Sequence, residues 1–153
     1  MNNALSMNGA VAKEADGYWE HYDHDADIGV RGVGWTMRDA FVQAALGLTA
    51  VVCDPSRVAM DNIVKVSCDA SGSEALFVEW LNTLIFEMAT RSMLFSRFEL
   101  QIRGNTLSAR IYGESIDREK HQPVVEVKGA TYTDLKVTQQ KEGCWVAQCV
   151  VDV

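Results

Sequence analysis

The stretch SGSEALFVEWLNTLIFEMATR, residues 71–91, carries apolar side chains around most of a helical circumference. The apolar residues that recur at helical spacing are Leu76, Phe77, Trp80, Leu81, Leu84 and Ile85. A helix with so broad an apolar stripe is characteristic of a buried position. The stretch therefore predicts a central core helix, with Ser71 or Ser73 as its N-cap. Its aromatic side chains are expected in the core and not in a cofactor site.

A second helix is predicted over residues 36–52, TMRDAFVQAALGLTAVV. Thr36 is its expected N-cap, because Asp39 follows three residues later in the pattern of a capping box. The rest of the chain consists largely of runs that alternate apolar and polar residues, which is typical of half-buried strands. The predicted strands are residues 28–34, 62–69, 97–104, 106–114, 124–132, 134–140 and 144–153. A hairpin is expected at Gly104-Asn105.

The order of these elements defines the expected fold class. Two helices cannot cover both faces of a doubly wound parallel sheet, so that class is excluded. We expect an α+β two-layer sandwich: a mainly antiparallel sheet with two helices packed on one face. The 153 residues fit a single domain. We place this domain at residues 18–153 and expect a flexible N-terminal leader over residues 1–17.

Charge and composition argue against several classes of function. The formal net charge of −7 opposes a strong direct grip on nucleic acid, which depends on Lys and Arg contacts with phosphates. No apolar run reaches the roughly 18 residues of a membrane helix, and the start of the chain lacks the features of a secretory signal. The four cysteines include no C-x-x-C pair, so they are expected as reduced thiols in a cytoplasmic protein.

Three acidic stretches contain candidate metal ligands. In HDADIG, Asp25 and Asp27 would share one face if the segment were extended. GESIDREKH places Asp117 in a loop after a predicted strand, and the chain ends with Asp152 and the terminal carboxylate of Val153. Hard cations such as Ca²⁺, Mg²⁺ and Mn²⁺ prefer oxygen ligands of this kind. Solvated loops and a solvated strand end remain the alternative interpretation of the same residues.

Lys128 is a further candidate, in the run VEVKGATY. It alternates with Glu126, so the two side chains would face the same side of a strand. An exposed, ion-paired lysine is the simpler interpretation of this pattern.

Five stretches, taken in order along the chain, resemble the archease family: HDADIGVRGVG, LFVEWLNTLIFEM, GESIDREKH, VEVKGATYTDLKV and the ending VDV. Each is weak alone, but their common order and spacing over about residues 18–153 make a specific match. The resemblance implies an α+β fold and a protein that is not itself an enzyme. It implies an accessory protein that helps an RtcB-type RNA ligase to become guanylylated and to turn over repeatedly in tRNA splicing and RNA repair.

The resemblance also implies a divalent metal, with Ca²⁺ favoured over Mg²⁺ and Mn²⁺, and no catalytic residue. The metal ligands that it implies are Asp27, Asp152, Val153 and Asp117. The residues expected to complete the acidic site or to contact the ligase are His24, Lys128 and His121. Two positions depart from the family pattern: Asp25 stands where threonine is common, and Thr133 stands where a histidine often occurs.

Two other classes of function stay open alongside the ligase activator. One is a chaperone-like module that binds RNA-modifying enzymes. The other is a small metal-dependent hydrolase, in which the aspartates would hold a metal-activated water. The hydrolase lacks an evident general base matched to a substrate pocket. The usual nucleophile and phosphate-loop motifs are also missing from the sequence.

Overall fold

The computed structural model describes residues 17–153, so all but the last residue of the expected leader lies outside the described residues. The elements in chain order are β2 (Gly17–His24), β3 (Asp27–Gly34), α1 (Met37–Val52), the short 3-10 turn η1 (Pro55–Arg57), β4 (Asn62–Asp69), α2 (Ser73–Arg91), β5 (Met93–Arg103), β6 (Thr106–Ser115), α3 (Arg118–His121), β7 (Gly129–Ala130), β8 (Lys136–Gln139) and β9 (Trp145–Asp152).

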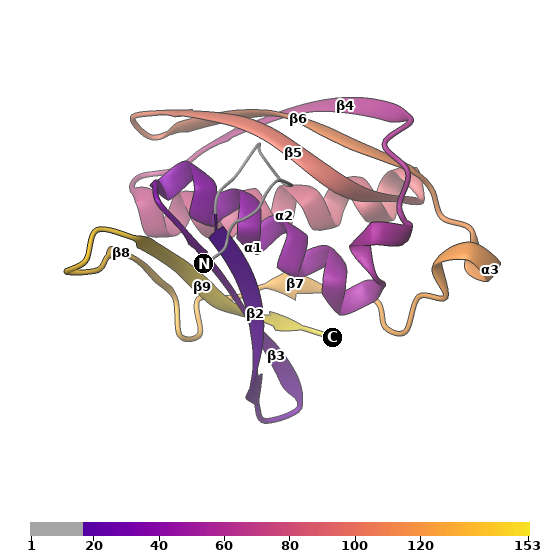
Figure 1. The fold of residues 1–153 in the computed structure, drawn as a ribbon, viewed down its shortest axis with the longest axis horizontal. Coiled ribbons are helices and arrows are strands. Elements are labelled where there is room, and N and C mark those ends of the chain that lie inside the picture. Colours follow the sequence, from indigo (N-terminus) through magenta and orange to yellow (C-terminus); the bar gives the residue numbers. More distant parts are fainter. Residues whose placement is uncertain (1–16) are drawn as a thin grey trace.

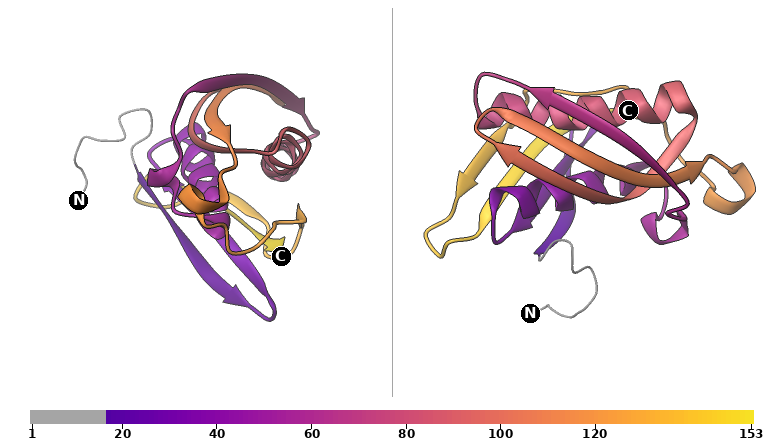
Figure 2. Two further views of the ribbon diagram at one scale, coloured as in Figure 1. Left: turned by 90° about the vertical axis from the view of Figure 1, so that its right-hand side faces the viewer. Right: turned by 90° about the horizontal axis from the view of Figure 1, so that it is seen from above.

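The described strands form two sheets. A five-stranded sheet has the order β2-β3-β9-β7, with β8 also paired to β9, and a three-stranded sheet has the order β4-β6-β5. Every pairing between these strands is antiparallel. Figure 1 shows α1 and α2 between the two sheets, and both helices contact strands of each sheet. The side view in Figure 2 shows the three-stranded sheet curving over the helices.

The α+β class, the antiparallel pairing and the packing of helices on one face of a sheet are confirmed. The difference from the expectation lies in the number of sheets, because the strands divide into two groups. The division has a physical basis in the broad apolar stripe of α2. A helix that is apolar around most of its surface needs cover on more than one side, and two sheets provide it.

Helix α1 packs directly on the backbone of β3. The helix begins as predicted, because the Thr36 side chain accepts a hydrogen bond from the Asp39 N–H at 3.0 Å. A Cβ atom at Gly32 would lie 2.1 Å from the carbonyl oxygen of Ala40 and 2.4 Å from the amide nitrogen of Ala44. The absence of a side chain at Gly32 therefore allows α1 and the hairpin strand to approach at backbone distance.

Helix α2 confirms the predicted core stripe, because all six of its apolar residues are buried. Trp80 is 0% exposed, and its indole N–H donates to the carbonyl of Phe41 at 3.0 Å, which links the two helices. The predicted caps are wrong: Gly72 is the N-cap and makes no side-chain capping bond. Ser73 is already the first helical residue.

One strand was missed, and one strand prediction is largely wrong. Strand β2 was not expected, because GYWEHYDH carries polar residues on both faces and lacks an apolar alternation. The run 124–132 contributes only the two residues of β7 to a sheet. Its earlier part has the composition of a strand but pairs with no strand among residues 17–153. Local pattern specifies an extended chain, whereas a sheet strand also needs a partner strand to pair with.

Two expectations from composition can be compared with the described residues. All four cysteines are free thiols, as expected. Cys53 and Cys149 are buried, and burial raises the pKa of the Cys149 thiol to about 12, which disfavours the reactive thiolate. No helix within residues 17–153 is long and apolar enough to cross a membrane.

Candidate functional site

The stretch HDADIG forms the tip of the β2–β3 hairpin. His24 and Asp27 are its last paired residues, and Asp25 and Ala26 form the turn between them. Asp25 has a φ of 52°, in the left-handed region that aspartate tolerates better than most residues. Because the chain reverses here, Asp25 and Asp27 do not lie on one face of a strand. The expectation for an extended segment is therefore wrong, and the Asp25 side chain is 94% exposed.

Strand β9 brings the far end of the sequence beside Asp27. The register pairs Ile28 with Val151, so Asp27 lies opposite Asp152 at the next position. The N–H of Val153 donates to Oδ1 of Asp27 at 3.2 Å. Residues directly opposite on antiparallel strands project from the same face. The structure thus brings together the three positions Asp27, Asp152 and Val153 that the family resemblance implies as metal ligands.

The row of paired residues extends across neighbouring strands. His24 pairs with Asp27 on one side, and Gly129 pairs with Asp152 on the other. The neighbouring residue Val151 is 0% exposed and belongs to the core, so the side chains of His24, Asp27 and Asp152 project from the opposite face. We refer to His24, Asp27, Asp152 and Val153 as the acidic row.

Helix α2 holds β7 beside the acidic row through Asn82. The Asn82 Oδ1 accepts from the Ala130 N–H at 2.8 Å, and its Nδ2 donates to the Ala130 carbonyl at 3.4 Å. Two residues earlier, the Lys128 N–H donates to the Asp152 carbonyl at 2.8 Å, and the Lys128 side chain is exposed. Asn82 had no predicted role. The sequence did contain one indication of a role, namely a polar residue among the apolar residues of a predicted core helix.

Tyr22 lies on the same face of the hairpin, two residues before His24. Its ring covers Gly29, where an added Cβ would lie 2.2 Å from the ring atom Cζ, and Arg31 Cζ lies 4.6 Å from the ring centroid. The Tyr22 hydroxyl is buried without a hydrogen-bond partner among the described residues. Burial, followed by the charge of Asp134, raises its pKa. A buried hydroxyl without a hydrogen-bond partner costs about 1–3 kcal/mol. Tyr22 is therefore an available hydrogen-bond donor on the face of the acidic row, and it was not identified from the sequence.

Asp117 and His121 belong to a different part of the molecule. Asp117 is the N-cap of α3, where its Oδ1 accepts from the N–H groups of Glu119 at 3.1 Å and Lys120 at 3.2 Å. Figure 1 shows α3 far from the turn between β2 and β3. The structure therefore does not bring Asp117 or His121 into the acidic row, and their geometry has a local explanation.

That local explanation centres on the carboxylate of Glu114. Its Oε2 accepts from the N–H of Ala59 at 2.8 Å, from Lys120 Nζ at 2.7 Å and from His121 Nε2 at 2.8 Å. The Asp117 N–H donates to His121 Nδ1, so the His121 proton is placed on Nε2. The pKa of Glu114 is lowered from its ordinary 4.5 to about 2, first by the hydrogen bond from the Ala59 N–H and then by those from Lys120 and His121.

The low pKa of Glu114 predicts an acid-dependent loss of stability. A carboxylate whose pKa is lower when folded contributes stability that is present above pH 4.5 and lost as the pH falls toward about 2. Glu114→Gln is expected to lower stability at pH 7 and to flatten its decline over this interval. Urea unfolding at a series of pH values measures both effects. A decline as steep in the variant as in the native protein would contradict the assigned role of Glu114.

The acidic row can be compared with the ligand set that a hard cation needs. In the described part of the chain, no group of three or more His, Cys, Asp or Glu side chains is placed to hold a metal ion. The row does offer the carboxylates of Asp27 and Asp152 and a main-chain oxygen of Val153, and these are the donors that hard cations prefer. A calcium ion takes about six to eight oxygen ligands. The donor chemistry fits such a cation, and a bound ion would need further ligands from water or from another molecule.

The fold and the site together define a class of protein: an α+β domain with two helices between antiparallel sheets and carboxylates gathered where β3 and β9 meet. The chain matches the model of the Archease protein family over residues 19–153. It is 37% identical over 139 residues to protein archease of Pyrococcus abyssi, covering 88% of this chain and 98% of that protein. Identity to protein archease of Thermococcus gammatolerans is 39% at the same coverage. The chain belongs to the archease family.

Solved structures agree with this assignment. The solution structure of Methanobacterium thermoautotrophicum protein 1598 matches with a TM-score of 0.78 at 29% identity, over 88% of this chain and 98% of that one. A crystal structure from Thermotoga maritima, described as an archease and possible chaperone, matches with a TM-score of 0.54 over 86% of this chain and 94% of that one. At 17% identity, that second likeness shows the fold alone. The family resemblance inferred from the five sequence stretches is confirmed.

Proposed function

We propose that this protein is a non-catalytic accessory protein that activates an RtcB-type RNA ligase. It promotes the guanylylation and the repeated turnover of that ligase in tRNA splicing and RNA repair. Membership of the archease family supports this proposal. The observation that carries it is the acidic row, in which Asp27 and Asp152, far apart in the sequence, lie opposite each other on one sheet face.

In this proposal the acidic row binds a divalent cation, with Ca²⁺ favoured over Mg²⁺ and Mn²⁺. The bound ion would offset the repulsion between two neighbouring carboxylates. The Val153 N–H holds the Asp27 carboxylate in place, and Asn82 holds β7 beside Asp152. Because the protein supplies only part of a coordination shell, the row is suited to a site that a partner completes. His24 and Lys128 flank the carboxylates and are proposed to contact the ligase.

The net charge supports a division of roles between the two proteins. With 21 acidic against 14 basic residues, this chain is poorly suited to hold RNA through its phosphates. The ligase would therefore bind the RNA while the accessory protein binds the ligase. A chaperone-like role toward other RNA-modifying enzymes is the second candidate. The description of the Thermotoga maritima structure as a possible chaperone favours that candidate.

The test is a guanylylation assay with the purified protein, the RtcB-type ligase of the same organism, GTP and Mn²⁺. We expect the ligase–GMP adduct to form faster than with ligase alone and each ligase molecule to join more than one RNA. The matched control replaces the protein by an equal amount of an unrelated acidic protein. Equal rates with and without the protein would overturn the proposal. Suppression of aggregation of the ligase without faster guanylylation would favour the chaperone-like role instead.

A further inference from the structure

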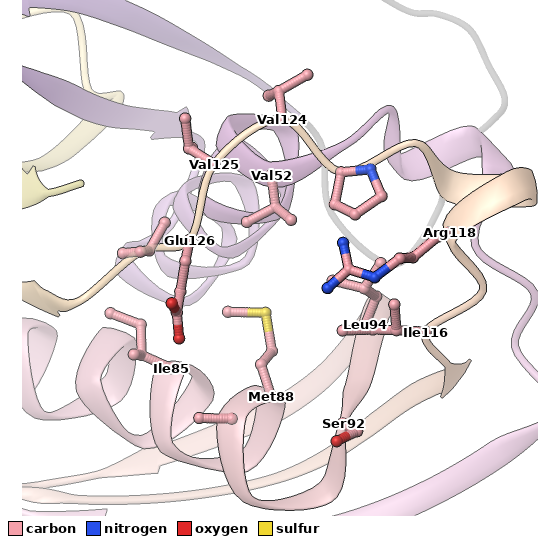
Figure 3. Close-up of a pocket in the computed structure, with 13 residues that line it drawn as sticks. Val52, Ile85, Met88, Ser92, Leu94, Ile116, Arg118, Val124, Val125 and Glu126 are labelled. Atoms are coloured by element: carbon pink, nitrogen blue, oxygen red, sulfur yellow. The ribbon is translucent and has the colours of Figure 1, made fainter.

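A pocket of about 450 Å³ lies between α2 and the segment of residues 123–127. Figure 3 shows this segment passing over the end of the helix, with the pocket beneath it. Its apolar lining includes Val52, Ile85, Met88, Leu94 and Ile116. The pocket shares no residue with the acidic row and lies at a separate place on the molecule. Its volume falls within the range of about 300–1,000 Å³ that binding pockets commonly have.

The segment over the pocket has the composition of a strand but pairs with no strand that the structure describes. Its two ends are held by backbone hydrogen bonds. The Val124 N–H donates to the carbonyl of Val52 at 2.9 Å, and the Lys128 N–H donates to the carbonyl of Asp152 at 2.8 Å. Between these anchors, the N–H groups of residues 125–127 have no hydrogen-bond partner in the described part of the chain. Val124 is 76% exposed. Val125 is 38% exposed, whereas Val127 is buried. A partly exposed apolar segment with unpaired backbone N–H groups is suited to pairing with an added strand.

Two opposite charges border the apolar lining. Figure 3 shows the Arg118 guanidinium reaching toward the pocket from one side and the Glu126 carboxylate from the other. Neither side chain takes part in an ion pair within residues 17–153. Both are exposed, so their charges are held beside an apolar surface without a structural partner. A complementary ligand would carry an acidic group at one end, a basic group at the other and an apolar group between them.

We infer that this pocket binds an extended segment of a partner protein, in which an apolar residue is flanked by one acidic and one basic residue. The apolar side chain contacts the lining formed by Ile85, Met88 and Leu94. The acidic side chain lies at Arg118 and the basic side chain at Glu126. The backbone of the bound segment pairs with residues 125–127, as an added strand does at a sheet edge. The site goes beyond the proposed activation of a ligase and does not depend on it.

Two labelled peptides test the inference by fluorescence anisotropy with the full chain. Their sequences are Ser-Asp-Ser-Leu-Ser-Lys-Ser and Ser-Lys-Ser-Leu-Ser-Asp-Ser, which differ only in the order of the charges. The native protein is expected to prefer one of them by about tenfold. Exchanging the charges of the pocket, in the double variant Arg118→Glu with Glu126→Arg, is expected to reverse that preference. Because both side chains are exposed, the exchange should leave the fold intact.

Lys65→Glu provides a matched control, because it reverses an exposed charge on β4 outside the pocket and should leave the preference unchanged. Failure of both peptides to bind at protein concentrations up to about 1 mM would overturn the inference. Equal binding of both peptides, or a preference that the double variant retains, would overturn it as well. Reversal of the preference by the double variant alone would establish the pocket as the binding site.

Discussion

Asp152→Ala is expected to lower the stimulation of ligase guanylylation by about tenfold or more, the scale on which altered metal sites lose affinity. Asp152 lies between β3 and β7 and is exposed on the sheet face that carries the acidic row. Its backbone forms the sheet contacts, including the carbonyl that accepts from the Lys128 N–H. The substitution therefore removes a carboxylate without removing those backbone bonds. The rate of ligase–GMP formation at limiting Mn²⁺ measures the effect.

Asp23→Ala is the matched control for this experiment. It removes the same charge from the same end of the sheet, but Asp23 pairs with Ile28 and projects from the other face. The Asp23→Ala variant should stimulate ligase guanylylation to within about twofold of the native protein, because screened charges on the opposite face act weakly. Full stimulation by Asp152→Ala, or equal losses in both variants, would show that the acidic row is not the functional site.

Two substitutions of Asp27 distinguish the effect of its charge from the effect of its hydrogen bond with the Val153 N–H. Asp27→Asn keeps an oxygen that can accept from the Val153 N–H, whereas Asp27→Ala loses that acceptor. If the charge binds the cation, both variants lose stimulation. If Asp27 only holds the end of β9 in place, the asparagine variant keeps its activity and the alanine variant does not.

Gly32→Ala is expected to destabilise the fold by about 3 kcal/mol or more, at the upper end of the costs of overpacking. The added Cβ would lie 2.1 Å from the carbonyl oxygen of Ala40 and 2.4 Å from the amide nitrogen of Ala44. Both are backbone atoms inside α1, so no side-chain rotation can relieve the overlap. The helix must shift away from the sheet. Urea unfolding followed by circular dichroism measures the change in the free energy of unfolding.

Gly72→Ala is the control, because nothing lies within 4 Å of the added Cβ and its φ is 177°. Its cost should stay below about 1 kcal/mol, the typical loss at an N-cap position. A Gly32→Ala variant within about 1 kcal/mol of the native protein would show that α1 and β3 do not approach at backbone distance in solution.

The parts of the fold that depend on local pattern could be predicted. Two such parts are the apolar stripe of α2 and the Thr36 cap of α1. Each depends on residues within one or two helical turns of each other, so the distances in the sequence directly determine which side chains meet. Strand β2 and the residues before β7 could not be assigned in the same way. Strand β2 lacks a local apolar alternation although its partner β3 follows directly after the turn, and residues 125–127 have no strand partner in the described part of the chain.

The candidate site shows the same division. The family resemblance singled out Asp27, Asp152, Val153 and Asp117 together. The structure brings the first three into one row through the register of β3 and β9. Asp117 instead is the N-cap of α3, which lies far from this row. Asn82 and Tyr22 received no predicted role, because their importance comes from Ala130 and Gly29, which they meet only in the folded chain.

The sequence by itself determined the α+β class, the buried face of α2, the cap of α1 and the family, because these depend on composition, short spacings and ordered motifs. Only the tertiary structure decided that two sheets enclose the helices and that the hairpin tip meets the end of β9. Within the described residues, it also left residues 125–127 without a strand partner. The pairing of strands far apart in the sequence, such as β3 with β9, is set by long-range register and by competition for shared edges, which no local stretch of sequence encodes.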